Sequence, residues 1–542
     1  MNPILRIVSL WGYRPIWLLL ATILSLGALV AGVALMGFSG HALGLAIIGA
    51  GLIIPALLPL IGITRVVLRY AERMIGHEAI FRALTDLRIW MFRGLARSAA
   101  GGLGLRHSGD ILARLVNDVD MLDGLFLRVF LPLAGAVVLL PIMAWLLWRE
   151  HGAALLVLAP FCFVSFWVPW RAARAAEENA GKAGLAMAAL RTAALDALHG
   201  LREVKIFAAE GRMLAEVQAR EAQLLAAQRD LVAKGAKLSA LAFIAAQLSV
   251  LLALILGFWG APRAAVVVVL VLVVAFEAVL GLPRAGLLYG QAKKAAARVV
   301  HAAESGPLVS DPLHPTPMPS RNALAFEHVS FRYAPDRPLV FQNLSFQLPE
   351  GARVAILGPS GIGKSTVAAM ILKLQAPESG QIRLGGVDIA QLPAEALRHR
   401  IAYLGQTTHL FADTIRNNLL LGNPQASDEV LWTALDAAQL GEVVRALPEG
   451  LDSWLEEGGG ALSGGQGRRL ALARTLLMDA PILLLDEPCN GLDSATEQEF
   501  FRVFNHATEG RTVLLIVHRL TGVEALDRIW RFTGGTLVAA TG

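Results

Sequence analysis

The sequence predicts an all-α membrane domain with six helices, followed by a smaller α/β domain. Long apolar runs fill the chain before residue 305, whereas short β-branched strands alternate with helical stretches after it. Hydrophobic residues make up 55% of the 542 residues and charged residues only 17%, and the mean hydropathy is +0.56. These values depart from those of soluble proteins toward those of membrane proteins, and the length indicates more than one domain.

Six apolar runs predict the membrane-spanning helices. They cover residues 16–37, 43–63, 125–148, 153–170, 239–260 and 264–283. Each approaches the ~20 residues that a helix needs to cross a hydrocarbon layer of about 30 Å. Helices buried in a soluble core have the same composition, but the presence of six such runs in the first 283 residues favours membrane spans.

The connections between these runs differ in charge. The three short ones, at 38–42, 149–152 and 261–263, hold two arginines in total, whereas residues 65–128 hold ten and residues 171–237 hold eleven lysines or arginines. By the positive-inside rule, the two long connections and both termini are cytoplasmic. We therefore expect a multi-pass membrane protein whose net charge of +5 reflects topology and not nucleic-acid binding.

The two long connections are themselves predicted to be helical. Residues 64–97 and 171–237 are rich in Ala, Leu, Arg and Glu, with few helix breakers, and they turn near 100–102 and 199–200. A Pro-rich polar stretch at 305–320 is typical of a linker. The expected domains are therefore a transmembrane domain at 1–304, the linker at 305–320 and the α/β domain at 321–542.

Neither a disulfide framework nor a cleavable signal is expected. Cys162 lies in an apolar run and Cys489 in a loop of the α/β domain, so the two are not placed to pair. The first apolar stretch is followed by Gly-Phe-Ser-Gly-His and not by a cleavage site of small residues.

The α/β domain contains a phosphate-binding loop. The apolar strand 354–357 runs directly into Gly358-Pro-Ser-Gly-Ile-Gly-Lys-Ser-Thr366, which matches G-x4-G-K-[ST] in the required strand–loop–helix context. Glycines allow backbone N–H groups to surround phosphates at a helix N-terminus. Lys364 would contact the β- and γ-phosphates of ATP, and Ser365 would bind Mg²⁺. The residues expected to hold the nucleotide are Gly358, Ser360, Gly361, Gly363, Lys364, Ser365 and Thr366.

Two further strands end in residues suited to ATP hydrolysis. The strand 481–485 leads into Asp486 and Glu487, and the strand 512–517 ends at His518. Asp486 can reach Mg²⁺, and Glu487 can polarise an attacking water. His518 would contact the γ-phosphate and orient the Glu487–water pair. Taken alone, Asp486 and Glu487 could form a solvated strand edge, and His518 could be a structural histidine. Their occurrence together with a phosphate loop favours the functional interpretation.

The segment Leu462-Ser-Gly-Gly-Gln466 precedes an Arg-rich helix and forms a second helix start suited to anions. With it, residues 321–542 closely resemble the ATP-binding cassette (ABC) superfamily, whose signature is LSGGQ. The resemblance implies a catalytic Q-loop residue that binds Mg²⁺ at Gln406, a D-loop at 490–493 and an aromatic residue that stacks on adenine at Tyr333. For Gln406 and Tyr333, an ordinary position on the surface of a strand is the alternative. The resemblance further implies that the signature residues Ser463, Gly464, Gly465 and Gln466 act on the ATP of a partner cassette.

The whole chain is similar to ABC exporters of the type IV fold, with a six-helix membrane domain and a C-terminal P-loop NTPase cassette. The stretches 69–82, 115–123, 275–278 and 454–459 resemble the CydC subunit of the CydDC family. That resemblance implies a heterodimer with a D subunit in the bacterial inner membrane, with the cassette in the cytoplasm. It also implies export of glutathione, cysteine or haem in support of cytochrome bd assembly.

Two membrane-domain residues are candidates for ligand contacts. His77 lies among arginines on the second helix, and the family resemblance points to it as a ligand of haem b; the alternative is a surface histidine beside basic groups. Glu277 lies at the end of an apolar run, where a carboxylate either faces a cavity or marks the membrane boundary. A lipid or multidrug exporter of the same fold and a haem-sensing regulatory ATPase subunit remain as alternative functions.

Overall fold

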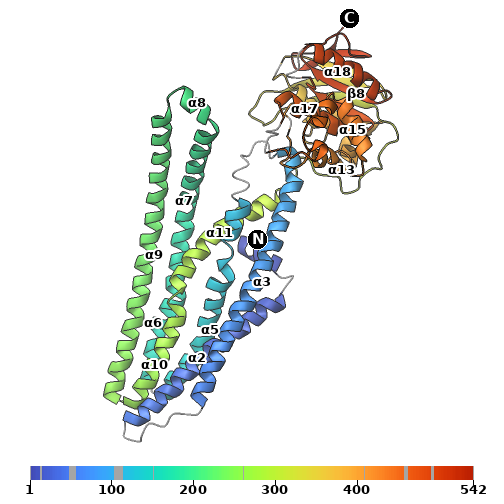
Figure 1. Ribbon diagram of the computed structural model, residues 1–542. Helices are drawn as coiled ribbons and strands as arrows, with labels where there is room; N and C mark the ends of the chain where they lie inside the picture. Colours follow the sequence, from blue (N-terminus) through green and yellow to red (C-terminus); the bar gives the residue numbers. More distant parts are fainter. Residues whose placement is uncertain are drawn as a thin grey trace. The chain divides into compact units, whose positions relative to one another are not determined.

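The computed structural model describes residues 2–11, 15–47, 57–102, 114–150, 152–260, 262–359, 361–407, 409–456, 462–489 and 494–540. The chain divides into two compact units (Figure 1). The first unit contains Met1–Arg97 and Leu105–Ser305. The second contains Ser98–Gly104 and Gly306–Gly542.

The first unit consists of helices. The α-helices are α1 (Pro3–Trp11), α2 (Pro15–Ile47), α3 (Leu57–Gly102), α5 (Leu131–Glu150), α6 (Leu158–Cys162), α7 (Val168–His199), α8 (Leu201–Ile206), α9 (Glu210–Gly260), α10 (Pro262–Val279) and α11 (Leu282–Glu304). Tighter or wider helical turns join them: η2 (Arg114–Asp118), η3 (Leu125–Phe130), η4 (Gly152–Val157) and η5 (Phe163–Trp167). Helices α7 and α9 run alongside each other, with α8 at the turn between them (Figure 1).

Five helical stretches in the described part of the chain are long and apolar enough to cross a membrane. They are Ile16–Ala46, Leu125–Arg149, Leu155–His199, Glu210–Ile255 and Ala264–Glu304. They correspond to five of the six predicted spans. The remaining span, at 43–63, falls partly on residues 48–56, which lie outside the described residues.

The predicted helical extensions are present. Helix α9 has 51 residues, which at 1.5 Å per residue is about 77 Å and more than twice the thickness of the hydrocarbon layer. The predicted turn at 199–200 is confirmed, because α7 ends at His199 and α8 begins at Leu201. At the other turn, α3 continues through Gly102, and residues 103–113 lie outside the described residues.

One predicted connection is wrong. Residues 38–42 were expected to link two spans, but α2 continues through them to Ile47. The polar residue Ser39 does not interrupt the helix, since its hydroxyl donates a hydrogen bond to the Leu35 carbonyl, 2.8 Å away. A serine that bonds back to the preceding turn in this way is compatible with a helix interior.

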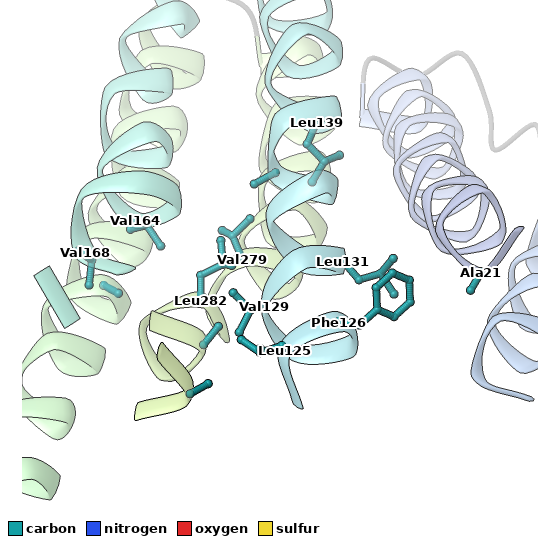
Figure 2. Packing of buried hydrophobic residues seen from close by; sticks show 14 of the residues in the cluster. Ala21, Leu125, Phe126, Val129, Leu131, Leu139, Val164, Val168, Val279 and Leu282 are labelled. Atoms are coloured by element: carbon teal, nitrogen blue, oxygen red, sulfur yellow. The ribbon is translucent and has the colours of Figure 1, made fainter. Parts of the chain in front are cut away.

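Apolar side chains from separate helices meet in the core of the first unit. Figure 2 shows Val164 and Val168 on one helix and Val129, Val279 and Leu282 on neighbouring segments, and all five belong to one buried cluster. Helices α11 and α7 approach each other so closely at Gly290 that no larger residue fits there. A Cβ atom added to Gly290 would lie 2.3 Å from the Ala173 carbonyl oxygen. Glycine at this position therefore permits the close packing of two membrane helices.

The second unit is an α/β domain with two sheets. Strands β1 (Leu324–Phe331), β2 (Phe341–Leu348), β4 (Ser379–Leu384) and β5 (Val387–Asp388) form an antiparallel sheet in the order β2-β1-β4-β5. The larger sheet has the order β10-β9-β3-β8-β7-β6. Its strands are β3 (Arg353–Leu357), β6 (Ile401–Leu404), β7 (Ile482–Asp486), β8 (Thr512–Val517), β9 (Arg528–Thr533) and β10 (Thr536–Ala539).

Helices surround these sheets, and the larger sheet is parallel except at β10. The helices are α12 (Lys364–Ile371), α13 (Ala394–His399), α14 (Ile415–Leu420), α15 (Asp428–Ala437), α16 (Gly441–Arg445), α17 (Gly464–Leu477) and α18 (Ser494–Ala507), with short turns η6 (Ile389–Gln391) and η7 (Gly450–Asp452). Because parallel strands run in one direction, the carboxyl ends of β3, β6, β7 and β8 lie at one edge. Ligand sites of parallel α/β sheets form at that edge.

The Pro-rich stretch contains no helix or strand, yet part of it is held against the α/β domain. The buried Lys373 amine donates to the Asp311 carboxylate at 3.0 Å and to the Leu392 carbonyl at 2.7 Å. The Ala394 amide also donates to Asp311, at 2.9 Å. Burial acts to raise the pKa of the Asp311 carboxyl, but the hydrogen bonds from Lys373 and Ala394 outweigh it and hold the pKa below its ordinary value.

Candidate functional site

The phosphate-loop motif lies where β3 ends and α12 begins. Gly363 caps the N-terminus of α12 with φ 109°, a conformation that L side chains rarely adopt. A Cβ atom there would lie 2.5 Å from Val340 Cγ1 and 2.9 Å from Phe341 Cε1. Gly361 also has a positive φ, of 80°, but open space around it. Ser360, another predicted nucleotide contact, lies outside the described residues.

The Lys364 amine lies inside the loop. It donates hydrogen bonds to the carbonyls of Gly358, 2.6 Å away, and Pro359, 3.0 Å away, and it lies 3.3 Å from His518 Nδ1. Burial lowers the pKa of Lys364, and the nearby carboxylates of Asp486 and Glu487 oppose that shift. The amine is thus a partly desolvated cation, held at the start of α12 by two carbonyls of the loop.

Asp486 ends β7 and is almost fully buried, with 1% of its surface exposed. One carboxylate oxygen, Oδ2, is buried with no hydrogen-bond partner in the described part of the chain. The Ser365 hydroxyl donates a hydrogen bond to this carboxylate, while burial, the larger effect, raises its pKa. A hydroxyl and a carboxylate with an unsatisfied buried oxygen are a donor set that fits Mg²⁺.

Glu487 follows directly and has a strained backbone, with φ 51°. Such a conformation costs about 1–3 kcal/mol in a non-glycine residue and is concentrated at functional sites. The Glu487 amide donates to the Ile516 carbonyl at 2.8 Å, which extends the β7–β8 pairing by one residue. Its carboxylate pairs with His518 Nε2 and accepts a hydrogen bond from Gln406 Nε2 at 3.2 Å.

His518 joins this carboxylate to the phosphate loop. It follows β8, and its Nδ1 lies 2.9 Å from the Gly358 carbonyl oxygen. The predicted residues at the ends of four strands are therefore brought together within one cluster: Gly358 and Lys364 after β3, Gln406 after β6, Asp486 and Glu487 at β7, and His518 after β8.

Tyr333 lies beside the first turn of α12. Its hydroxyl is 2.8 Å from Thr366 Oγ1, and its ring packs edge-on against Phe331. The residue remains 58% exposed, so that a ring face is open next to the loop. An exposed aromatic face at this position can stack on a base.

The signature segment starts α17. The Ser463 hydroxyl accepts a hydrogen bond from the Gln466 amide at 3.3 Å, and the Gln466 side chain accepts one from the Ser463 amide at 2.8 Å. This reciprocal capping box fixes the helix start. Ser463 and Gly464 are exposed and make no contact with the cluster above among the hydrogen bonds of the described residues. The predicted D-loop, 490–493, lies outside the described residues.

One residue of the cassette was not assigned from the sequence. Arg468, on α17, is only 7% exposed and donates hydrogen bonds to main-chain carbonyls beside the cluster. The sequence signal that could have found it is a charged residue on the helix face that also carries Ala471, Leu472 and Thr475, all of them buried.

A charged pocket of about 350 Å³ lies in the first unit. It brings together the two membrane-domain candidates, His77 on α3 and Glu277 on α10, which are 200 residues apart in the chain. Arg69 and Arg73, which the sequence places beside His77, line the same pocket. Its lining also includes Ser25, Glu72 and Arg128, which sequence reasoning did not single out.

The donor set of this pocket fits a haem. Imidazole is a common axial ligand of haem iron, and guanidinium groups match the geometry of carboxylates such as propionates. His77 is exposed and its ring lies 5.9 Å from that of Phe81. An imidazole, three arginines and space in the range of small-molecule sites are therefore present together.

The chain is similar to known proteins over nearly all of its length. Residues 16–281 match the family model of the ABC transporter transmembrane region, and residues 341–490 match the ABC transporter family model. The glutathione/L-cysteine transport system ATP-binding/permease protein CydC of Escherichia coli (strain K12) is 34% identical, over 99% of this chain and 96% of its own length. The corresponding CydD of Bacillus subtilis (strain 168) is also 34% identical, over 86% of this chain and 82% of its own length.

The fold has a solved counterpart. The structure of a bacterial Atm1-family ABC exporter with ATP bound superposes with a TM-score of 0.87 and 25% sequence identity, covering 97% of this chain and 94% of that chain. Fold and sequence thus agree on a helical membrane region joined to an ATP-binding cassette.

Proposed function

This chain belongs to the ABC transporter family, with the transmembrane and ATPase regions on one polypeptide, and from that premise we propose that it is one half of a heterodimeric exporter of glutathione and L-cysteine. It is a multi-pass membrane protein that couples ATP hydrolysis to transport. The observation that supports glutathione and L-cysteine as the transported molecules is the 34% identity with a glutathione/L-cysteine transport protein, which extends over 99% of the chain. The bacterial inner membrane, with the cassette in the cytoplasm, is the location that fits these relatives and the distribution of basic residues.

We assign the roles in ATP hydrolysis from the cluster at the strand ends. Lys364 would neutralise phosphate charge, and Ser365, Asp486 and Gln406 would hold Mg²⁺, which supplies charge neutralisation at the phosphates when bound. Glu487 is the group that orients and deprotonates water, and His518 holds its carboxylate in place.

The arrangement of the cassette supports a partner. The signature start of α17 and the phosphate loop do not meet within this chain among the described contacts, and in ABC transporters each signature acts on the ATP of the other cassette. The relatives include both a CydC and a CydD, and we propose a D-type subunit as the partner.

The pocket around His77 supports a second ligand. We propose that it binds haem b, whose iron would be held by the His77 imidazole and whose carboxylates would be bound by Arg69, Arg73 and Arg128. The haem would be either a cargo or a regulatory ligand. The same pocket favours one alternative function, a haem-sensing regulatory ATPase subunit.

Transport in membrane vesicles tests the exporter proposal. The chain is co-expressed with its partner, and inverted vesicles are supplied with ATP and labelled glutathione or L-cysteine. Glu487→Gln is expected to abolish ATP-dependent accumulation, and Glu509→Gln, at an exposed carboxylate paired only with His506 in the described structure, serves as the control. Wild-type accumulation with Glu487→Gln would show that this site does not power transport. Accumulation of lipid or drug in place of thiol would favour another exporter of the same fold.

Absorption spectroscopy tests the haem site. The purified complex is titrated with haem, and His77→Ala is expected to shift the Soret band and weaken binding. His199→Ala, at the distant end of α7, is the matched control. An unchanged spectrum and affinity in His77→Ala would refute the haem assignment while leaving the exporter proposal intact.

A further inference from the structure

Arg468 makes an unusual set of contacts inside the cassette. Its Nη1 donates to the Gln406 carbonyl at 2.6 Å, its Nη2 to the carbonyls of Asp486, at 2.6 Å, and Glu487, and its Nε to the Pro488 carbonyl at 3.1 Å. The side chain is almost completely buried. A single guanidinium thus binds the main chain at four positions, in two separate loops.

The position of these carbonyls explains why a buried charge is useful there. One carbonyl belongs to Asp486, the last residue of β7, and the other three lie just beyond the ends of β6 and β7. At these points the strands stop pairing and main-chain groups lose their ladder partners. A buried carbonyl without a partner is costly, and charge-assisted hydrogen bonds are stronger than neutral ones. The planar guanidinium carries N–H groups on three separate nitrogens and so reaches four carbonyls in two chain segments, which the compact ammonium of a lysine cannot span.

The contacts surround the residue that the proposed mechanism uses as the base. The Glu487 peptide has a left-handed φ and is held through its amide by the Ile516 carbonyl and through its own carbonyl by Arg468. Arg468 also binds the main chain of Gln406, whose side chain donates to the Glu487 carboxylate. One arginine therefore restrains both the base and a partner of its carboxylate.

We infer that Arg468 is a positioning residue for ATP hydrolysis, which holds the Glu487 turn and the Gln406 loop in register from the signature helix α17. Since Arg468 lies two residues after Gln466, a displacement of the signature segment is transmitted to the Glu487 turn through one side chain. The inference deepens the ATPase part of the proposed function, and it does not depend on the cargo.

Steady-state ATP hydrolysis by the purified complex with its partner tests this role. Arg468→Lys keeps the charge but cannot bind the four carbonyls together. The measured quantity is the Glu487-dependent turnover, which is the part of kcat that Glu487→Gln removes. It is expected to fall on the order of 10- to 100-fold, as a displaced catalytic group does, while KM for ATP stays nearly constant because the phosphate loop is untouched.

The matched control is Arg469→Lys. Arg469 is the next residue of the same helix and donates to the Gln439 carbonyl, at 2.7 Å, and not to the Glu487 turn. Its turnover is expected to remain near the wild-type value. All rates are measured well below the thermal midpoint of each variant, so that lost activity does not reflect unfolding.

The double variant separates positioning from general stabilisation. If Arg468 acts through Glu487, then Arg468→Lys causes no further loss in a Glu487→Gln background. An equal further loss in that background, a rise of KM in proportion to the loss of kcat/KM, or an unchanged turnover in Arg468→Lys would each overturn the inference. Loss of thiol export with intact hydrolysis would bear on the cargo proposal and not on this one.

Discussion

Replacing Gly363 with alanine tests how tightly the structure constrains the phosphate loop. The residue has φ 109°, and an added Cβ atom would lie 2.5 Å from Val340 Cγ1 and 2.9 Å from the fully buried Phe341 ring. Gly361, in the same loop, has φ 80° and nothing within 4 Å of an added Cβ. The two alanine variants therefore share the backbone strain and differ in the steric overlap.

The expected magnitudes follow from these two contributions. Backbone strain costs about 1–3 kcal/mol in either variant, and forcing an extra carbon into a packed site adds about 1–3 kcal/mol in Gly363→Ala alone. For a domain of this size, each kcal/mol lowers the thermal midpoint by about 2–4 °C. The cassette transition of Gly363→Ala is therefore expected about 2–12 °C below that of Gly361→Ala.

Differential scanning calorimetry of the purified complex provides the measurement. The cassette transition is identified as the one that Mg²⁺-ATP moves upward, because a ligand stabilises the state that binds it. Equal midpoints for Gly361→Ala and Gly363→Ala would refute the reasoning, since they would show that the overlap with Val340 and Phe341 is relieved without cost.

Two further predictions concern packing and pH. Gly290→Ala is expected to destabilise the membrane unit by about 1–3 kcal/mol, because the added Cβ would lie 2.3 Å from a carbonyl oxygen of α7. Gly281→Ala, with open space around the added Cβ, serves as the control. Equal thermal stability of the two variants in detergent would contradict this prediction. The pKa of Asp311 is lower in the folded state than its ordinary 3.8, so its pairing with Lys373 stabilises the fold above about pH 4 and loses its effect as the pH falls through the folded-state pKa. Asp311→Asn should therefore lower the thermal midpoint at pH 6 and reduce its decline between pH 5 and pH 3, and an unchanged decline would show that this carboxyl does not contribute.

The cluster of polar residues at the strand ends of the cassette was predictable because its members follow strands. Lys364, Asp486 and His518 each come after a short apolar segment, and parallel strands end at the same edge of a sheet. The order of the strands, with β8 between β3 and β7, was not available from the sequence. That order brings His518 against both Gly358 and Glu487.

Arg468 and the charged pocket show where sequence reasoning stopped. The sequence pattern predicts only an Arg-rich helix at Arg468, because nothing local shows that its acceptors include carbonyls 18 and 62 residues away. His77 and Glu277 were treated as separate candidates. Only the packing of α3, α10 and the turn η3 that carries Arg128 places them in one pocket.

The amino-acid sequence alone determined the class of the protein and its chemistry. Apolar runs of membrane-spanning length and the loop, signature and strand-end motifs are local patterns, and local patterns depend on short-range sterics, hydrogen bonding and hydropathy. The tertiary structure decided what depends on long-range packing: the left-handed turn at Glu487, the four carbonyls around Arg468, and the continuation of α2 through residues 38–42. These features exist because distant segments satisfy each other's polar groups and fill each other's space, and no window of the sequence contains both partners.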